Sequence, residues 1–398
     1  MQAPTYAARL SGTNLERAGD YNQRVTLQAI RVHGNITRSE LAELTGLTAP
    51  AIANITKRLL RDRLIVGTGR VQGGRGQPPT LLSINSDGCF SIGVNIDRDH
   101  VAIVALDLLG HVRARASFEA DFALPKAVAD FFHGSVQRML AAGEIDLERL
   151  IGIGVAIPDR LSQIDLPRRP ASYAAWDTTD IPALFTNVVP GPVFIENDAT
   201  AAAMGELQFG HGLRQSNFFY VLINAGLGGG LVVDGVQYRG AHGRSGEIGS
   251  LLLHSRRTTA RNLGQVVSLS GLYDVLRRGG HVISRPEALN QLTAGGQKLV
   301  DEWVSMAVDL LTDPLIAVNC LLDPQAVFIG GRVPAKLIDR LANGLNRRLA
   351  LRGRAVPTIA PVQRAAMAAD APAVGAALLP FNDRLLPTRA ALMKTADV

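Results

Sequence analysis

Residues 193–206 place an amide and a carboxylate at a junction between a strand and a helix. The apolar run 193–195 predicts a strand, and the alanine-rich segment after Asp198 has high helix propensity. Ligands of α/β folds bind at such carboxyl ends of strands. Asp198 can accept two hydroxyl hydrogens and Asn197 can donate and accept, which suits a polyol such as a sugar. The alternative is that Asp198 only caps the helix.

A second junction follows in residues 219–233. The apolar run 219–223 predicts a strand, and Asn224 begins a glycine-rich loop that leads to another strand at 231–233. Asp234-Gly235 is a hairpin signal. Downstream, residues 238–249 read Tyr-Arg-Gly-Ala-His-Gly-Arg-Ser-Gly-Glu-Ile-Gly and include His242 and Glu247.

The order of these motifs resembles the ROK family, named for its repressors, open reading frames and kinases. The resemblance rests on residues 196–198, the glycine loop, the 238–249 segment and Phe-Ile-Gly-Gly at 328–331, and it covers nearly the whole chain. It implies an α/β fold with an N-terminal winged helix-turn-helix and a two-lobed, sugar-kinase/actin-like (ribonuclease H-like) body. It also implies that Asn197, Asp198 and Glu247 hold a sugar-like ligand between the lobes.

Several customary sugar partners of the family are missing. Asp159 stands where the family usually has a glycine after proline, and no asparagine precedes Trp176 at the place where one often binds sugar. We expect Trp176 to be a packing residue. Asp159, His242 and Arg244 are candidates to replace the missing partners, and the arginine would suit an acidic sugar or a phosphate.

The excess positive charge lies at the N-terminal end. Residues 1–85 carry eleven Lys/Arg against five Asp/Glu, and the other 313 residues carry 30 of each. A basic head on a neutral body indicates a polyanionic partner for the head, because Lys and Arg displace counterions from phosphates. A basic, solvated face without a partner is the alternative.

The head has the signals of a winged helix-turn-helix. Apolar spacing predicts a first helix over 22–32, the capping box at 37–40 starts a second, Gly46 ends it and Thr48 caps a third. The strands expected at 64–66 and 81–84 would form a wing. We therefore expect a flexible arm over residues 1–20, a DNA-binding domain over 21–86, and an effector-binding and oligomerisation body over 87–398.

The third helix would enter the major groove by its N-terminal half. Its expected base contacts are Thr48, Ala51 and Asn54, and its expected phosphate contacts are Lys57, Arg58 and Arg61. Arg75, set among glycines in the wing, would reach a minor groove. The alternative for Arg75 is an ordinary exposed arginine.

The nucleotide-binding motif of ROK sugar kinases is altered in this chain. In those kinases an Asp-x-Gly-Gly-Thr-Lys turn cradles ATP phosphates, whereas Asn95-Ile-Asp97-Arg-Asp99-His100 stands at the matching place. Carboxylates there repel phosphate, and the glycines that let backbone N–H groups approach are absent. We expect no ATP binding and no enzyme activity.

Zinc-bearing family members continue the Gly-Glu-Ile-Gly motif with a histidine and a cysteine cluster. Here Ser250 follows, no cysteine comes before Cys320, and His254 is the remaining ligand type nearby. A tetrahedral site needs about four ligands, so no zinc is expected. No apolar run approaches a membrane span or a signal-peptide core, and we expect a cytoplasmic protein without a membrane partner.

These features predict a ligand-responsive transcription regulator, most simply a repressor of carbohydrate-related genes. Its partners would be operator DNA and a small effector, a sugar or sugar derivative. A homodimer or homotetramer is expected, because paired half-sites supply specificity that one short recognition helix lacks. The alternatives are a ROK sugar kinase with a DNA-binding head and a constitutive DNA-binding protein whose body only dimerises.

Overall fold

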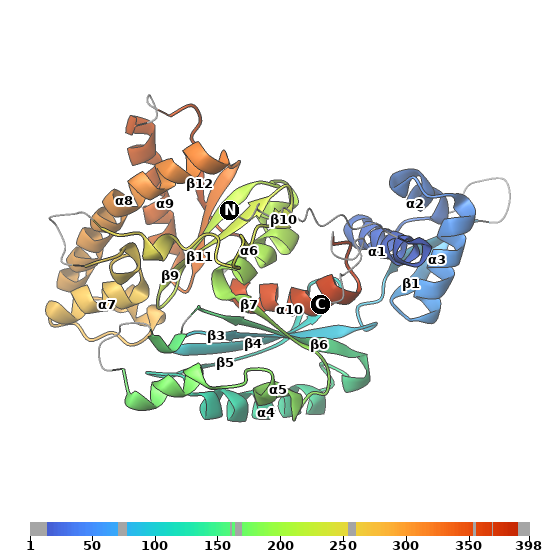
Figure 1. The fold of residues 1–398 in the computed structure, drawn as a ribbon, viewed down its shortest axis with the longest axis horizontal. Helices are drawn as coiled ribbons and strands as arrows, with labels where there is room; N and C mark the ends of the chain where they lie inside the picture. The colour runs from blue at the N-terminus through green and yellow to red at the C-terminus, as the bar shows by residue number, and fades with distance from the viewer. Residues whose placement is uncertain are drawn as a thin grey trace, which may run out of the picture.

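The computed structural model describes residues 14–70, 78–159, 161–163, 169–253, 260–352, 356–367 and 369–388. A small N-terminal head lies beside a larger body of two lobes (Figure 1). Arg75 and His254 lie outside the described residues, as do residues 1–13 of the expected arm.

The head is a three-helix unit with a two-stranded wing. It consists of α1 (Leu15–His33), α2 (Arg38–Thr45), α3 (Ala49–Arg61) and the antiparallel strands β1 (Ile65–Arg70) and β2 (Thr80–Ile84). The predicted capping box is present, since Thr37 and Glu40 satisfy each other's backbone N–H groups. Gly46 ends α2 in the left-handed conformation at φ 69°.

The expected boundary of the arm was wrong. Residues 15–20 belong to α1, because the Asn14 side chain caps the helix by accepting the Arg17 N–H. Leu27 and Ile30, fully buried further along α1, pack the helix into the head's core. The flexible arm stays a prediction for residues 1–13.

The first lobe is a five-stranded mixed sheet in the order β5-β4-β3-β6-β7. Its strands are β3 (Phe90–Ile96), β4 (His100–Asp107), β5 (Val112–Glu119), β6 (Leu150–Ile157) and β7 (Val193–Asn197). Helices α4 (Pro125–Ala141) and α5 (Ala183–Thr186) cover its outer face (Figure 1). Trp176 is buried there and donates its indole N–H to the Ala123 carbonyl, so it packs the lobe as expected.

The second lobe is a five-stranded sheet in the order β10-β9-β8-β11-β12. Its strands are β8 (Phe218–Ile223), β9 (Leu227–Val233), β10 (Val236–Gln237), β11 (Ala326–Gly331) and β12 (Val362–Arg364). Its outer helices are α7 (Leu269–Arg278), α8 (Ala294–Leu322) and α9 (Ala335–Arg352). The short 3-10 helices of the body are η1 (Leu147–Arg149), η2 (Leu161–Gln163), η3 (Ala171–Asp177), η4 (His211–Leu213), η5 (Ile248–Ser250), η6 (Leu263–Gln265) and η7 (Pro286–Gln291).

Helix α8 is long and apolar enough to cross a membrane by length and composition alone. Here it packs along α9, and Asp301, Asp309 and Asp313 on α8 pair with arginines of α9. Side-by-side packing with a row of ion pairs is typical of a helix inside a lobe.

Two helices lie between the sheets (Figure 1). Helix α6 (Asp198–Phe209) packs on β8 and β9, and α10 (Ala371–Arg384) packs on β3 and β6. They touch each other so closely that a Cβ at Gly375 would run into the Ala201 carbonyl. The small residues of α6 therefore let both lobes share one tightly packed middle layer.

The glycine run expected as a loop lies inside a strand. Gly228 and Gly230 belong to β9, where a Cβ would collide with Ala199 on α6, at 2.8 Å from its Cβ in the case of Gly228. These glycines therefore permit close packing of a helix on a strand. The predicted hairpin at Asp234-Gly235 is present, with φ of 51° and 71°.

Candidate functional site

The Asn197–Asp198 junction lies where β7 ends and α6 begins. Asn197 is the N-cap, and its Oδ1 accepts the N–H groups of Ala199 and Thr200 at 3.0 and 3.1 Å. Asp198 is buried, and its Oδ1 accepts the Ala199 N–H at 2.8 Å. Asn197, and not Asp198, is therefore the residue that caps α6. The alternative interpretation, in which Asp198 only caps the helix, does not hold. The second carboxylate oxygen of Asp198 is left for another contact.

Four of the five predicted ligand residues share this region. The charge of Glu247 helps to raise the pKa of Asp198, and the charge of Asp159 helps to raise the pKa of Glu247. Arg244 Nε lies 3.0 Å from Asp159 Oδ2. His242 is exposed on the loop after β10 and makes no hydrogen bond or ion pair with any other residue that the structure describes. The structure therefore brings the carboxylates and Asn197 together and leaves His242 at the margin.

The charge of the site is mainly negative. Glu196, at the end of β7, is buried and pairs with Arg239 at 3.2 Å. Burial raises the pKa of Glu196 and of Glu247 above their usual range. Arg239 and Arg244 each pair with one carboxylate of the site, and Asp198 and Glu247 have no ion-pair partner among the described residues.

Asp198 has the most perturbed acidity of the site residues. Burial and the nearby Asp97 and Glu247 raise its pKa to about 7, against the lowering effect of the Ala199 N–H. A carboxyl group with this pKa changes its charge near neutral pH and can serve either as donor or as acceptor. Perturbed groups of this kind cluster at functional sites.

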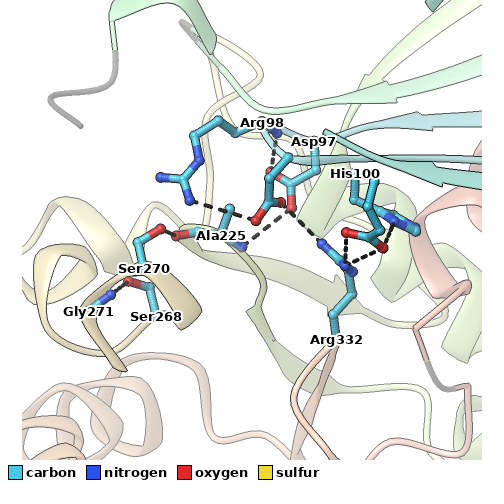
Figure 2. Close-up of polar contacts among 10 residues, drawn as sticks. Asp97, Arg98, His100, Ala225, Ser268, Ser270, Gly271 and Arg332 are labelled. Atoms are coloured by element: carbon cyan, nitrogen blue, oxygen red, sulfur yellow. Dashed lines mark hydrogen bonds and ion pairs between the residues drawn. The ribbon is translucent and has the colours of Figure 1, made fainter. Parts of the chain in front are cut away.

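An ion cluster joins the two lobes where the altered kinase motif lies (Figure 2). Arg332 follows β11 in the second lobe, and its guanidinium contacts Asp99 at 3.1 Å and both oxygens of Glu119 at 2.6 Å. His100 Nδ1 lies 2.6 Å from Glu119 Oε1. The Arg332 side chain is only 4% exposed. We call Arg332, Asp99, Glu119 and His100 the inter-lobe latch.

The latch stabilises the ionised form of one of its acids. Although burial works against it, the His100 hydrogen bond and the Arg332 charge hold the pKa of Glu119 below its usual range. For Asp99, burial and Asp97 raise the pKa despite the nearby arginines. Arg332 also donates its backbone N–H to Asn224 Oδ1 at 3.0 Å, and Asp97 Oδ2 accepts the Ala225 N–H at 3.4 Å. The Asn95-to-His100 turn is thus bonded to the opposite lobe.

A hollow with a volume of about 690 Å³ opens between the lobes beside the latch. Its lining includes Arg98, Asp99, Phe122, Ser270 and Tyr273. None of the predicted ligand residues lines it. The hollow therefore neither supports nor contradicts the predicted ligand site. The case for that site rests on the chemistry of Asn197, Asp198 and Glu247 themselves.

The predicted DNA-contacting face of α3 is largely exposed. Thr48 caps the helix, and Asn54, Lys57, Arg58 and Arg61 are exposed, whereas Ala51 is half-buried. Ile52, Ile55 and Leu59 face the core of the head. The periodicity of the sequence therefore separated the two faces of α3 correctly.

The cations of this face differ in their partners. Arg58 lies 3.9 Å from Asp20 and Arg61 lies 2.9 Å from Asp62, both in exposed pairs that are worth little in water. Lys57 has no ion-pair partner among the described residues. Arg38, on α2, was not predicted; its Nε donates to Thr56 on α3 at 2.8 Å and fixes the two helices together.

No group of three or more His, Cys, Asp or Glu side chains within the described ranges is arranged to hold a metal ion. The expected absence of zinc remains a prediction, since the segment with His254 lies outside those ranges.

Comparison with known proteins settles the family. The ROK family model matches residues 91–382, and a winged helix-turn-helix DNA-binding model matches residues 20–66. The chain belongs to the ROK family. This ROK protein therefore carries a winged DNA-binding head on a sugar-kinase-like body.

Its relatives include regulators. It is 30% identical to the uncharacterized protein y4fQ of Sinorhizobium fredii, over 90% of both chains. It is 28% identical to the xylose repressor of Bacillus spizizenii, over 58% of this chain and 60% of the repressor. It is 25% identical to the xylose repressor of Staphylococcus xylosus, over 82% and 85%.

Solved structures share the fold. A ROK family transcriptional regulator, a homolog of the E. coli MLC protein, matches with a TM-score of 0.69 and 21% identity over 93% of this chain and 98% of that one. A ROK glucokinase from Streptomyces griseus matches with a TM-score of 0.57 and 22% identity over 73% and 98%. The match to the regulator is long enough to include the head. The match to the kinase covers a share of this chain about equal to that of the body alone.

Sequence reasoning missed the pairing of Arg332 across the two lobes of this ROK protein. Arg332 follows the quoted Gly330-Gly331 motif directly, but its partners Asp99 and Glu119 are more than two hundred residues away. The two aspartates of the Asn95-to-His100 turn were a usable signal, because buried carboxylates require a cation or a proton.

Proposed function

We propose that this chain is a sugar-responsive DNA-binding repressor and that it is not a kinase. The observation that carries the proposal is the presence, in one chain, of an exposed, basic recognition helix and of a cluster of carboxylates around the buried Asp198. The names of its relatives, the xylose repressors, support both the regulatory role and a sugar as effector.

The effector is a small neutral sugar held by Asn197, Asp198 and Glu247, with Asp159 at the rim. Carboxylates accept hydroxyl hydrogens well, and a neutral ligand adds no charge to a site that is already negative. The excess of carboxylates around Asp198 argues against the acidic sugar or phosphate that the sequence had left open. His242 is a candidate only for the outer edge of the ligand.

Operator binding uses the exposed face of α3. Thr48, Ala51 and Asn54 lie toward its N-terminal half and would meet base edges, and Lys57, Arg58 and Arg61 would meet phosphates. The wing, with Arg75, would add a minor-groove contact. Two copies of the chain would present two heads to paired half-sites, as a homodimer or within a homotetramer.

The rival function is a sugar kinase with a DNA-binding head. Asp198 stands where the family's catalytic base would be, but the latch fills the inter-lobe position with side chains of this chain. Asp97 is buried and bonded to the Ala225 backbone, so a third carboxylate faces any phosphate placed there. Like charges in a buried site oppose nucleotide binding strongly.

The experiment is a thermal-stability screen of the full chain against neutral sugars including xylose, sugar acids, sugar phosphates, and ATP with magnesium. Any ligand at about 100 times its Kd adds about 2.7 kcal/mol to the stability of the folded state. We expect a neutral sugar to stabilise the chain and ATP to have no effect. Asp198→Asn should abolish the sugar effect, and Asp130→Asn, an exposed substitution on α4, should leave it intact.

Each remaining outcome favours a rival. Sugar-dependent ATP turnover that Asp198→Asn removes would establish the kinase. Operator binding that no member of the screen alters, together with no stabilisation, would favour the constitutive DNA-binding protein.

A further inference from the structure

The head is docked on the body through α1. Arg31 on α1 donates from Nη2 to Gln208 Oε1 at 2.6 Å, and its guanidinium lies 5.5 Å from the centre of the Phe209 ring. Arg24, two turns earlier, donates to the carbonyls of Asn382 and Leu386 at 3.3 Å. Arg31 thus reaches the C-terminal end of α6, and Arg24 reaches the C-terminal end of α10. Cations are favoured at such helix ends.

The contact continues into a shared apolar core. Leu27 and Ile30 of α1 belong to one buried cluster with Ile52 and Leu59 of α3 and with Met204 of α6. The same cluster includes residues of α10. Because α1 packs against α3 within the head and contacts the body through Arg24 and Arg31, a shift of α1 relative to the body would re-aim the recognition helix.

The opposite end of α6 is the acidic site. Asn197 caps the helix and Asp198 is its first residue, whereas Gln208 and Phe209 are its last two. A helix of 12 residues is about 18 Å long. One helix therefore has the proposed effector site at its N-terminus and the DNA-binding head at its C-terminus.

Helix α6 is packed tightly along most of its length. Residues 198–206 are all buried, and the fully buried Glu206 carboxylate accepts the N–H groups of His211, Ala366 and Met367 at 2.9 to 3.0 Å. Close packing on Gly228 and Gly375 leaves no space in which the helix could bend. Tightly packed elements transmit a displacement because their interior has low compressibility.

We infer that α6 couples the inter-lobe site to the DNA-binding head, and that Arg31 is the positioning residue that carries the displacement into α1. The inference rests on the proposed function in one respect, the identity of the site at the N-terminus of α6 as the effector site. Operator binding and the state of that site would then be linked in both directions, as allosteric coupling requires.

Gln208 offers a test from the body side, away from the DNA-contacting face of α3. Gln208→Lys places a cation against Arg31 and should break the contact between Arg31 of α1 and residue 208 of α6. Gln208→Glu keeps an acceptor and should preserve it. Gln137→Lys, on the exposed face of α4 in the first lobe, is the matched control for an added positive charge.

The first readout is affinity for an operator duplex selected from random DNA by the unmodified protein, measured by fluorescence anisotropy. Gln208→Lys should change the Kd at least about fivefold, the lower end of typical allosteric couplings. Gln208→Glu and Gln137→Lys should stay within about twofold, and circular dichroism should show that all variants are folded. An unchanged Kd for Gln208→Lys would overturn the inference.

The second readout is hydrogen–deuterium exchange of residues 193–206 with and without the operator. Operator binding should alter exchange there in the unmodified protein and in Gln208→Glu, and not in Gln208→Lys. If the contact between Arg31 and Gln208 only held the head in place, Gln208→Lys would weaken DNA binding, but operator binding would not change the exchange of residues 193–206. The absence of a change in the unmodified protein would refute the coupling.

A third arm separates this inference from the proposed function. Xylose and the other sugars of the screen are added to the operator complex. If no sugar shifts operator affinity but the first two readouts hold, the coupling stands and the sugar effector falls. If a sugar shifts the affinity equally in Gln208→Lys and the unmodified protein, the effector stands and α6 is not its route.

Discussion

Replacement of Asp198 by asparagine tests the electrostatics of the proposed site directly. Asn keeps the size of the side chain and an oxygen for the Ala199 N–H but removes the titrating group. The pKa of Asp198 is raised from 3.8 to about 7 because the group is buried beside other carboxylates. A raised pKa means that the folded state holds its proton more tightly than the unfolded state does.

The sign and size of this effect on stability follow from the linkage between proton binding and folding. Stability contributed by the protonated group is complete below pH 3.8 and is lost as the pH rises through 7. At 1.36 kcal/mol per pKa unit, the full loss is about 4 kcal/mol, of which about 3 kcal/mol falls between pH 5 and pH 8. Asp198→Asn should therefore be more stable than the unmodified chain at pH 8, by a margin that shrinks at pH 5.

The assay is urea unfolding of both proteins at pH 5 and pH 8, with the melting temperature as a second measure. Other groups in the chain titrate over this range, so the quantity of interest is the change in the difference between the two proteins. Asp130→Asn, on the exposed surface of α4, should show no such change. A difference between Asp198→Asn and the unmodified chain that is equal at both pH values would refute the assignment of a buried, proton-holding Asp198.

Three further substitutions test other parts of the structure. Arg332→Met should destabilise the chain by about 3–5 kcal/mol in chemical unfolding, because it removes the buried cation that Asp99 and Glu119 share; an unchanged midpoint would mean that the latch is not formed in solution. Gly230→Ala should cost about 1–3 kcal/mol, since its Cβ would meet the Ala199 carbonyl, whereas Gly226→Ala, with no atom within 4 Å of the new Cβ, should fold normally. Lys57→Gln should weaken binding to all duplexes alike and lower the slope of log K against log salt by about one, and a selective loss for one sequence would instead indicate a base contact.

Much of the head was predictable because its signals are local. The capping box at Thr37 and Glu40, the left-handed Gly46 and the Thr48 cap each involve residues three or four apart. Such hydrogen bonds form within one helical turn and leave a readable pattern. The start of α1 was missed because Asn14 is a cap within a polar stretch that lacks the apolar spacing of a helix.

The helices of the body show where local signals mislead. A proline usually kinks or ends a helix, yet Pro314 lies inside α8 and Pro380 lies inside α10. Proline destabilises a helix interior in isolation, and here burial of α8 and α10 between neighbouring elements outweighs that cost. Tertiary packing supplies most helix stability in proteins.

The candidate site was predictable only where its residues belong to local motifs. The Asn197–Asp198 junction could be read from one strand and one helix, and Glu247 followed from the family motif. Its neighbours Glu196 with Arg239 and Asp159 with Arg244 are joined across loops that the sequence does not register. The excess negative charge of the site, which favours a neutral ligand, became visible only when Asp97, Asp198 and Glu247 were seen close together.

The sequence by itself determined the order of elements, the family, the two faces of α3 and the placing of a carboxylate at the start of α6. Each of these depends on residues close in the chain or on the period of a helix or strand. The tertiary structure decided the proton affinity of Asp198, the pairing of Arg332 with Asp99 and Glu119, and the docking of Arg31 on the end of α6. These depend on burial and on charges brought together from distant parts of the chain, which only the folded arrangement fixes.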